Sequence, residues 1–299
     1  MGSSMSLGFK RPLLTVAAPL ALMLLSACGG GEALPTAEAS LQVALASTDL
    51  SVGRNRVVFA LIDPQSGPIR GANVQVTTYF LSSGGQEGPI EAVNAVFQEW
   101  PVRPSGIYTV ELTFDRPGNW GLVAEAIDAD GVRRPADTGL QIKESSSSPG
   151  LGMPAPKSDS KTLSDVEDIE QITSDRDPDR GLYEKTIAEV IESGRPLMLT
   201  FSTPAFCQTA TCGPQLDVVK SIKREFGDRA EFIHIEVFDN PHLMEGNIAN
   251  GVLSPTLAEW GLVSEPWTFV IDRKGLVSAK FEAFTTRTEL EDALVAVLE

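Results

Sequence analysis

The segment FSTPAFCQTATCGPQLD, residues 201–217, contains two of the three cysteines of this 299-residue chain. Cys207 and Cys212 are separated by four residues, and a Gly-Pro pair follows the second cysteine. The apolar run PLMLTFST before them reads as a buried strand, and the residues after them read as an amphipathic helix. Two cysteines at a strand-to-helix junction indicate a disulfide or a redox pair, provided that the chain enters an oxidising compartment.

The spacing of the two cysteines restricts how they can meet. Residues five apart on one continuous helix are separated by about 7.5 Å along its axis, which is too far for a disulfide. A bridge therefore needs Cys207 in the loop and a helix that begins between Thr211 and Pro214, and proline suits the first helical turn. Cys212 would then lie at the positive end of the helix, which lowers a thiol pKa. This geometry alone leaves open which of the two cysteines attacks and which resolves.

The N-terminal segment predicts export. Lys10 and Arg11 precede an apolar run, 13–27, that is shorter than the roughly 20 residues of a membrane-spanning helix. The sequence LSAC, which ends at Cys28, resembles the lipobox of bacterial lipoproteins. That resemblance implies a signal peptide over 1–27 and lipidation of Cys28, which would anchor the chain to the outer face of a membrane in the cell envelope. The alternative is an ordinary secretory signal with an incidental cysteine.

The composition excludes one class of function. The formal net charge is −16, and such an acidic chain should be repelled by nucleic acid and by anionic lipid. Nucleic-acid binding is therefore not expected, and an acyl chain would be the main hold on a membrane. The 42% of hydrophobic residues supply material for a core, and the length suggests two domains.

Residues 28–39 read as a tether, and residues 40–144 read as an all-β domain. Short alternating runs such as NRVVFALID and GIYTVELTF are separated by turn signals such as DRPGN, which predicts an antiparallel β-sandwich of about seven strands. The aromatic residues of this region, Tyr108 and Trp120 among them, are expected in the core. The pattern resembles the immunoglobulin-like domains of bacterial exported proteins, and nothing in it identifies a ligand.

Residues 145–180 have the composition of a flexible acidic linker. The run DRDPD, 175–179, alternates like the opening of a calcium-binding loop. Arg180 stands where that loop requires glycine, and Thr186 stands where it requires a bidentate glutamate. We therefore expect no metal site there.

From residue 181 to 299, helical and strand patterns alternate. Helices are expected in LYEKTIAEVIES, GPQLDVVKSIKREFGD, PTLAEWGL and TRTELEDALVAVLE, and strands in PLMLTFST, AEFIHIEVFD, WTFVIDRKG and LVSAKFEAF. This order implies a mixed sheet covered by helices on both faces. His234 lies between isoleucines on a strand and is expected to be a packed core residue.

The region 181–299 resembles the thioredoxin fold. The resemblance is carried by the strand LMLTF, by the cysteine loop with CGPQLD, and by EPWTFVIDRKG, where Pro266 falls at the family's cis-proline. It implies that the backbone of Glu265 lies beside the thiols, where an extended substrate could pair with it. Two departures stand out: the family's C-x-x-C is replaced by a C-x4-C motif, with Gln215 in the place of a cysteine, and the buried acid of the preceding strand is missing.

The resemblance implies a membrane-anchored, extracytoplasmic thiol–disulfide oxidoreductase without a cofactor or a metal. It would act through Cys207 and Cys212 on the thiols and disulfides of exported proteins, with Glu265 and Pro266 as the substrate-binding residues and an unidentified membrane or soluble redox partner. The P-x-L-D segment also matches thioredoxin helices in which the proline lies further into the helix, and that register places Cys207 within a residue of the family's attacking cysteine. We therefore expect Cys207 to attack and Cys212 to resolve, with the reverse assignment left open. One alternative is a copper-binding metallochaperone, because two thiols with a histidine or a thioether suit Cu(I). The other is a non-enzymatic binding or scaffold lipoprotein whose disulfide is structural.

Overall fold

The computed structural model describes residues 40–99, 106–127, 131–208 and 210–299. The expected signal peptide, the tether and Cys28 lie outside these residues. All the described residues belong to one compact unit, Ala39–Glu299. Within the described ranges, no helix is both long enough and apolar enough to cross a membrane.

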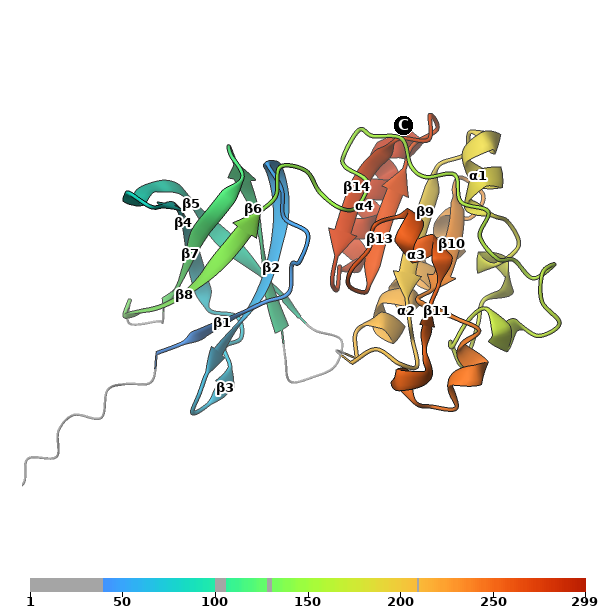
Figure 1. The fold of residues 1–299 in the computed structure, drawn as a ribbon, viewed down its shortest axis with the longest axis horizontal. Helices are drawn as coiled ribbons and strands as arrows, with labels where there is room; N and C mark the ends of the chain where they lie inside the picture. The colour runs from blue at the N-terminus through green and yellow to red at the C-terminus, as the bar shows by residue number, and fades with distance from the viewer. Residues whose placement is uncertain (1–39, 100–105, 128–130, 209) are drawn as a thin grey trace, which may run out of the picture. The chain divides into compact units, whose positions relative to one another are not determined.

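Eight strands of the described residues form the N-terminal domain (Figure 1). They are β1 Gln42–Leu45, β2 Gly53–Asp63, β3 Gly67–Pro68, β4 Asn73–Ser82, β5 Gly85–Glu99, β6 Gly106–Phe114, β7 Gly118–Ile127 and β8 Arg133–Ile142. They pair in the order β1-β2-β6-β5-β4-β7-β8, with β3 beside β2, and every one of these pairings is antiparallel.

This arrangement differs from the expected seven-stranded sandwich, because the strands follow one continuous path. The long strand β5 joins the two halves: its residues between 85 and 95 pair with β4, and its residues 96–99 pair with β6. The path nearly closes on itself, since the backbone of Lys143, just after β8, pairs with the backbone of Leu50 and Val52. The sequence did not predict β5, because it contains Pro89 and its first half has no buried residue.

The alternating pattern of the N-terminal domain places its apolar residues in one core, as expected. Every second residue of β6 from Tyr108 to Phe114 is buried, and Trp120 on β7 is fully buried against the ring of Phe114. Strand alternation of this kind puts one set of side chains inside and the other in solvent. The core is therefore confirmed for the aromatic residues that the sequence assigned to it.

The C-terminal domain has the predicted alternation of elements. Its main elements are α1 Ile187–Ser193, β9 Leu197–Ser202, α2 Cys212–Phe226, β10 Glu231–Glu236, α3 Pro255–Glu259, β13 Trp267–Ile271, β14 Val277–Glu282 and α4 Arg287–Leu298, and a two-stranded ribbon joins β11 Phe238–Asp239 to β12 Val252–Leu253. The sheet order is β10-β9-β13-β14, in which β10 and β9 are parallel and the other pairs are antiparallel.

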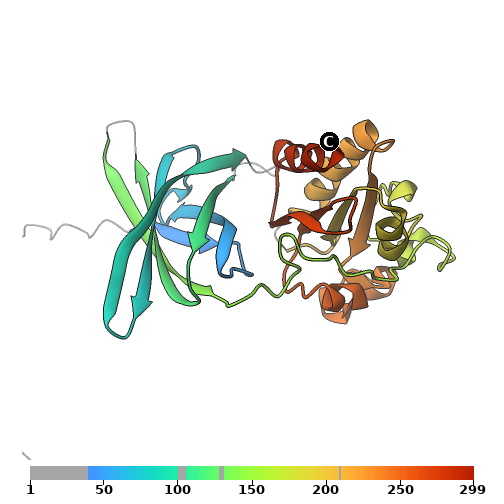
Figure 2. The ribbon, with the colours of Figure 1, turned by 90° about the horizontal axis from the view of Figure 1, so that it is seen from above.

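Helices cover both faces of this sheet, as expected (Figure 2). Apolar residues of α1 and α3 pack against one face, where Phe201, Trp260 and Phe269 form an aromatic cluster. Apolar residues of α2 and α4 pack against the other face around Met198 and Val270. Strands β9 and β13 are buried on both faces, so every residue in them is buried and most are apolar, with Thr200, Ser202 and Thr268 as the polar exceptions.

The connecting segment, residues 145–180, is not the free linker that its composition indicated. Its Ala155 and Ile172 are buried in the two cores of the C-terminal domain. Its serines bind backbone and indole groups: Ser160 accepts the N–H of Ile187 at 3.1 Å, and Ser158 accepts the indole N–H of Trp260 at 3.1 Å. Composition missed these contacts because the residues that make them are irregularly spaced.

The N-terminal and C-terminal domains contact each other through paired charges. Arg56 of β2 is nearly buried and binds Glu289 at 2.9 Å, and it donates to the carbonyl oxygen of Glu282 at 3.1 Å. The carboxylate of Glu282 in turn accepts the N–H of Thr48 at 2.8 Å and the hydroxyl of Ser264 at 2.6 Å. The charged side chains at this contact, Arg56, Glu282 and Glu289, all make hydrogen bonds, so the contact requires these particular surfaces of the two domains to meet.

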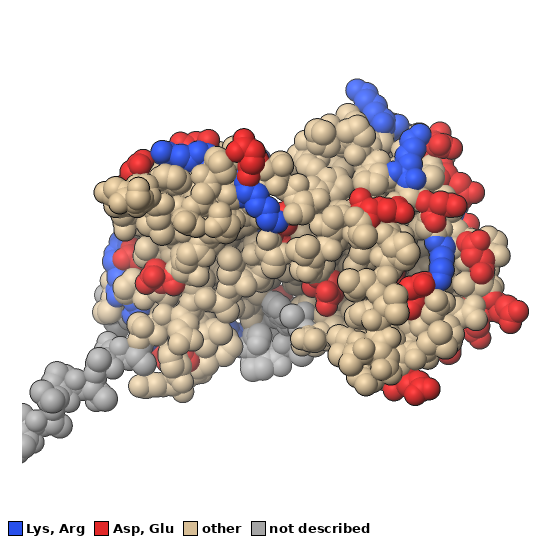
Figure 3. Space-filling view, in the orientation of Figure 1, with Lys and Arg blue, Asp and Glu red and all other residues tan. Residues whose placement is uncertain are grey.

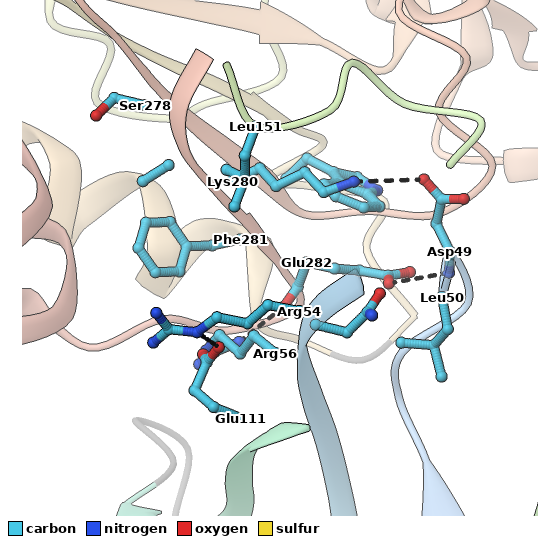
Figure 4. Close-up of a pocket in the computed structure, with 13 residues that line it drawn as sticks. Asp49, Leu50, Arg54, Arg56, Glu111, Leu151, Ser278, Lys280, Phe281 and Glu282 are labelled. Carbon is cyan, nitrogen blue, oxygen red and sulfur yellow. Dashed lines mark hydrogen bonds and ion pairs between the residues drawn. The ribbon is translucent and has the colours of Figure 1, made fainter. Parts of the chain in front are cut away.

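A cavity of about 260 Å³ lies at this contact (Figure 4). Its lining includes Lys280 of β14, whose ammonium group approaches Asp49 to 4.0 Å, and Arg54, which binds Glu111 at 2.9 Å. The charged groups that line the cavity are thus paired within the protein.

Candidate thiol site

Strand β9 delivers the chain to the cysteine loop. The strand ends at Ser202, and the carbonyl oxygen of Thr203 accepts the backbone N–H groups of Phe206 and Cys207 at 3.3 and 3.1 Å. The N–H of Ala205 is bound by the hydroxyl oxygen of Ser174 at 3.1 Å. Three consecutive N–H groups that lead to the first cysteine are therefore held by fixed acceptors.

Helix α2 begins at Cys212, within the interval that the spacing of the cysteines required. The preceding residue, Thr211, makes no side-chain cap to the helix. Instead, the backbone N–H of Cys212 donates to Sγ of Cys207 at 3.4 Å. The sulfur of Cys207 thus takes the place of a capping oxygen at the positive end of the helix, where negative charge is favoured.

The two thiols differ in exposure. Cys207 is partly exposed, Cys212 is fully buried, and they are not joined by a disulfide in this structure. The hydrogen bond to Cys207 and then burial raise the pKa of the Cys212 thiol. This corrects the expectation that the helix end lowers the pKa of Cys212, because the hydrogen bond with Cys207, burial and the charge of Cys207 all raise it.

The peptide bond between Glu265 and Pro266 is cis, as the sequence predicted for this position. Glu265 is half-buried, and burial followed by the charge of Cys207 raises the pKa of its carboxyl group. The side chain of Glu265 therefore lies within electrostatic range of Cys207. The expected role of the Glu265 and Pro266 backbone in substrate binding stays a prediction.

The two departures from the thioredoxin pattern, Gln215 in the place of a cysteine and the absent buried acid, have structural explanations. Gln215, in the place of a second cysteine, is fully buried and accepts the N–H of Thr285 at 2.8 Å, so it ties α2 to the start of α4. Thr200 lies in the strand where the thioredoxin family has a buried acid and this sequence has none. It is hydrogen-bonded to Thr268 on β13 at 3.2 Å. Neither residue supplies a group that could exchange a proton with the thiols near neutral pH.

A buried acid that the sequence did not point to lies near the loop. Glu236, the last residue of β10, is 4% exposed, and burial raises the pKa of its carboxyl group. It accepts the N–H and the hydroxyl of Ser174 at 2.9 and 2.6 Å. The feature of the sequence that could have pointed to Glu236 is its position as an acid at the end of the apolar run FIHIE. The thioredoxin resemblance alone does not single out this acid.

Neither histidine lies in a set of side chains that could ligate a metal. His234 is buried, as expected, and its two ring nitrogens contact Tyr183 Oη at 2.8 Å and Ser202 Oγ at 2.9 Å. His242 lies on the exposed turn after β11. Among the described residues, no group of three or more histidine, cysteine, aspartate or glutamate side chains could hold a metal ion.

The charged side chains on the visible face of the C-terminal domain are mainly acidic (Figure 3). Figure 3 shows acidic side chains spread over the visible face of the C-terminal domain, with few basic ones among them. This agrees with the formal charge of −16 for the whole chain. A strongly acidic surface disfavours polyanionic partners.

The sheet order, the helices on both faces and the loop before α2 together define a domain with a thioredoxin-like fold. No protein-family model matches the sequence, and no curated protein matches it. Among solved structures, the chain is similar to a thioredoxin-family thiol:disulfide interchange protein from Chlorobium tepidum, with 18% identity, 38% of this chain and 86% of that chain covered, and a TM-score of 0.29.

Two further solved structures are similar at the same level. StoA from Bacillus subtilis is 18% identical, with 33% of this chain and 82% of that chain covered and a TM-score of 0.27. A secreted thiol-disulfide isomerase from Corynebacterium glutamicum is 19% identical, with 35% and 71% covered and a TM-score of 0.28. At these values the class of fold rests on the strand order of the domain itself.

Proposed function

We propose that this protein is an extracytoplasmic thiol–disulfide oxidoreductase that acts on exported proteins through Cys207 and Cys212. The observation that carries the proposal is the hydrogen bond of 3.4 Å from the N–H of Cys212 to Sγ of Cys207, next to a fully buried second thiol. An N–H aimed at a sulfur stabilises negative charge on it, and the thiolate is the form that attacks a disulfide.

The exchange follows from the different positions of the two thiols. The thiolate of Cys207 attacks one sulfur of a substrate disulfide, so that a mixed disulfide forms and the other substrate sulfur leaves as a thiolate. Cys212 then loses its proton and attacks the sulfur of Cys207, which releases the second substrate sulfur. The substrate gains two electrons and the Cys207–Cys212 pair is oxidised; the reverse sequence oxidises a substrate dithiol.

The backbone at Glu265 and Pro266 is the proposed site for the substrate segment. Its position beside the thiols is supported by the effect of the charge on Cys207 upon the carboxyl group of Glu265. An extended peptide could form backbone hydrogen bonds there, with its cysteine directed at Cys207.

The proposed setting is the outer face of a membrane, where Cys28 carries a lipid. The lipobox-like LSAC sequence supports this part of the proposal. Expression of the full chain in a bacterium with labelled fatty acid should label the protein, and Cys28→Ser should abolish the label. Equal labelling of both proteins would contradict the anchor.

The reduction potential of the pair separates exchange from a structural bridge. Structural disulfides of secreted proteins typically have potentials below roughly −300 mV, whereas labile exchange pairs have higher ones. We expect the pair to equilibrate with glutathione and to have a potential above that limit. A bridge that glutathione cannot reduce in the folded protein would favour the scaffold function.

A further inference from the structure

We propose that Ser174 is a positioning residue for the thiol pair: its hydroxyl group holds the loop of Cys207 at the geometry from which Cys207 and Cys212 close a disulfide. The inference rests on the proposed function and assigns a role to the connecting segment, which lies outside the cysteine motif. Ser174 precedes Cys207 by more than thirty residues, and no pattern in the sequence links the two.

The hydroxyl group of Ser174 makes two directed hydrogen bonds. It accepts the backbone N–H of Ala205 at 3.1 Å, and it donates its proton to Oε2 of Glu236 at 2.6 Å. The backbone N–H of Ser174 donates to the same carboxylate oxygen at 2.9 Å. Because the proton is committed to Glu236, the oxygen of Ser174 is left to act as an acceptor for the cysteine loop.

Glu236 provides a rigid anchor for this arrangement. Its second oxygen, Oε1, accepts the backbone N–H groups of Val237 and Phe238 at 3.0 and 3.4 Å. The residue lies at the end of β10 in register with Ser202, the last residue of β9 before the cysteine loop. The anchor is therefore fixed to the same sheet edge from which the loop begins.

Ser174 binds one of the three consecutive N–H groups from Ala205 to Cys207. Phe206 and Cys207 both donate to the carbonyl oxygen of Thr203, and Ala205 donates to Ser174. If the hydroxyl group is removed, the N–H of Ala205 loses this acceptor and the loop gains freedom directly before Cys207. The distance between the two sulfurs would then be less well defined.

The neighbouring residue extends the same connection to the second cysteine. The carboxylate of Asp175 binds the ammonium group of Lys220 on α2 at 2.5 Å, and Lys220 also donates to the carbonyl oxygen of Asp177 at 2.8 Å. The side chain of Lys220 is 9% exposed. Adjacent residues of one segment thus hold the loop of Cys207 and the helix that begins at Cys212.

The expected effect is on the closure of the disulfide. A lost hydrogen bond of ordinary strength changes an equilibrium by about threefold to tenfold. The equilibrium constant for forming the Cys207–Cys212 bridge against glutathione should fall by that factor in Ser174→Ala. For this two-electron couple the change corresponds to a potential about 15 to 30 mV less negative.

The experiment measures this equilibrium in the full chain, with Cys28→Ser as the common background. The protein is equilibrated with mixtures of reduced and oxidised glutathione, the free thiols are blocked with an alkylating reagent, and mass spectrometry gives the fraction of bridged protein. Ser160→Ala is the matched control, because it removes a hydrogen bond of the same type and length in the same segment, away from the cysteines. The isosteric pair Ser174→Thr and Ser174→Val, which differ in the hydroxyl group, replaces Ser174→Ala if that variant does not fold.

The inference predicts a lowered equilibrium constant for Ser174→Ala and Ser174→Val and parental values for Ser174→Thr and Ser160→Ala. Unchanged closure in Ser174→Ala, with the parent forming the bridge normally, would overturn the role of Ser174 and leave the proposed function intact. An equal loss in Ser160→Ala would overturn it as well, because the effect would then be general destabilisation. A parent that forms no bridge at any glutathione ratio would overturn both proposals.

Discussion

The backbone N–H of Cys212 points at Sγ of Cys207 across 3.4 Å. This contact shows how two cysteines five residues apart can meet: Cys207 lies in the loop, and its sulfur takes the capping position of the helix that Cys212 begins. The same geometry gives the two cysteines different environments: one is partly exposed at a helix terminus, and the other is fully buried beneath it.

The difference in environment predicts selective alkylation. In the reduced, folded protein, iodoacetamide should modify Cys207 at least about tenfold faster than Cys212, because only a reachable thiolate reacts. Peptide mass spectrometry after short exposures, in the Cys28→Ser background, measures the two rates. Protein unfolded in urea is the control, in which the rates should become similar. Faster labelling of Cys212 in the folded protein would contradict the arrangement.

Burial of His234 predicts a loss of stability in mild acid. Burial lowers the pKa of His234 to about 4 from 6.5, so between these values the unfolded chain binds a proton that the folded chain does not. The free energy of unfolding should therefore fall by about 2 kcal/mol more between pH 7 and pH 4.5 in the parent than in His234→Gln. Urea unfolding at the two pH values measures this difference.

Other groups near His234 make the comparison with a variant necessary. Asp175 favours and Lys220 disfavours its charged form, and Glu236, whose pKa is raised by burial, stabilises the fold as the pH falls and so opposes the effect. A parental slope in His234→Gln would show that His234 is not the group responsible.

The contact between the two domains predicts strong coupling between Arg56 and Glu289. Their side chains are 8% and 23% exposed, and removal of one partner leaves a poorly solvated charge. A double-mutant cycle with Arg56→Met and Glu289→Gln should give a coupling free energy of about 1 to 3 kcal/mol in urea unfolding.

The neighbouring pair of Arg54 and Glu111 is the matched control for this cycle. It has the same distance of 2.9 Å, but its side chains are 72% and 48% exposed, so its coupling should stay below about 0.5 kcal/mol. A coupling free energy in the Arg56 cycle as small as that expected for the control would mean that the Arg56 contact does not help to hold the domains together.

The sequence predicted the C-terminal domain well because local sequence patterns mark the start and the type of its helices and strands. Buried strands such as β9 are mostly apolar runs, and α4 begins with a capping box between Thr286 and Glu289. Helix α1 proved shorter than its pattern, since the capping box at Thr186 and Glu189 places its start after the apolar residues Leu182 and Tyr183.

The features that the sequence missed depend on contacts between distant residues. Strand β5 is polar over its first half and pairs with two different strands, so neither alternation nor length marked it. Ser174 and Glu236 are 62 residues apart, and a serine in a polar segment gives no sign of its partner. The connecting segment looked flexible because its composition is polar, whereas in the fold many of its polar side chains and backbone groups are bound to distant residues.

The central claim is that Cys207 attacks a substrate and Cys212 resolves the mixed disulfide. Its most direct test is to express Cys212→Ser and Cys207→Ser in a bacterium that exports the chain and to compare the disulfide-linked complexes on a non-reducing gel after acid quenching. We predict that Cys212→Ser accumulates mixed disulfides with exported proteins, because the attacking thiolate remains and the resolving thiol is gone, and that Cys207→Ser accumulates few. Accumulation only in Cys207→Ser would reverse the roles, and no accumulation in either folded variant would contradict thiol–disulfide exchange as the function.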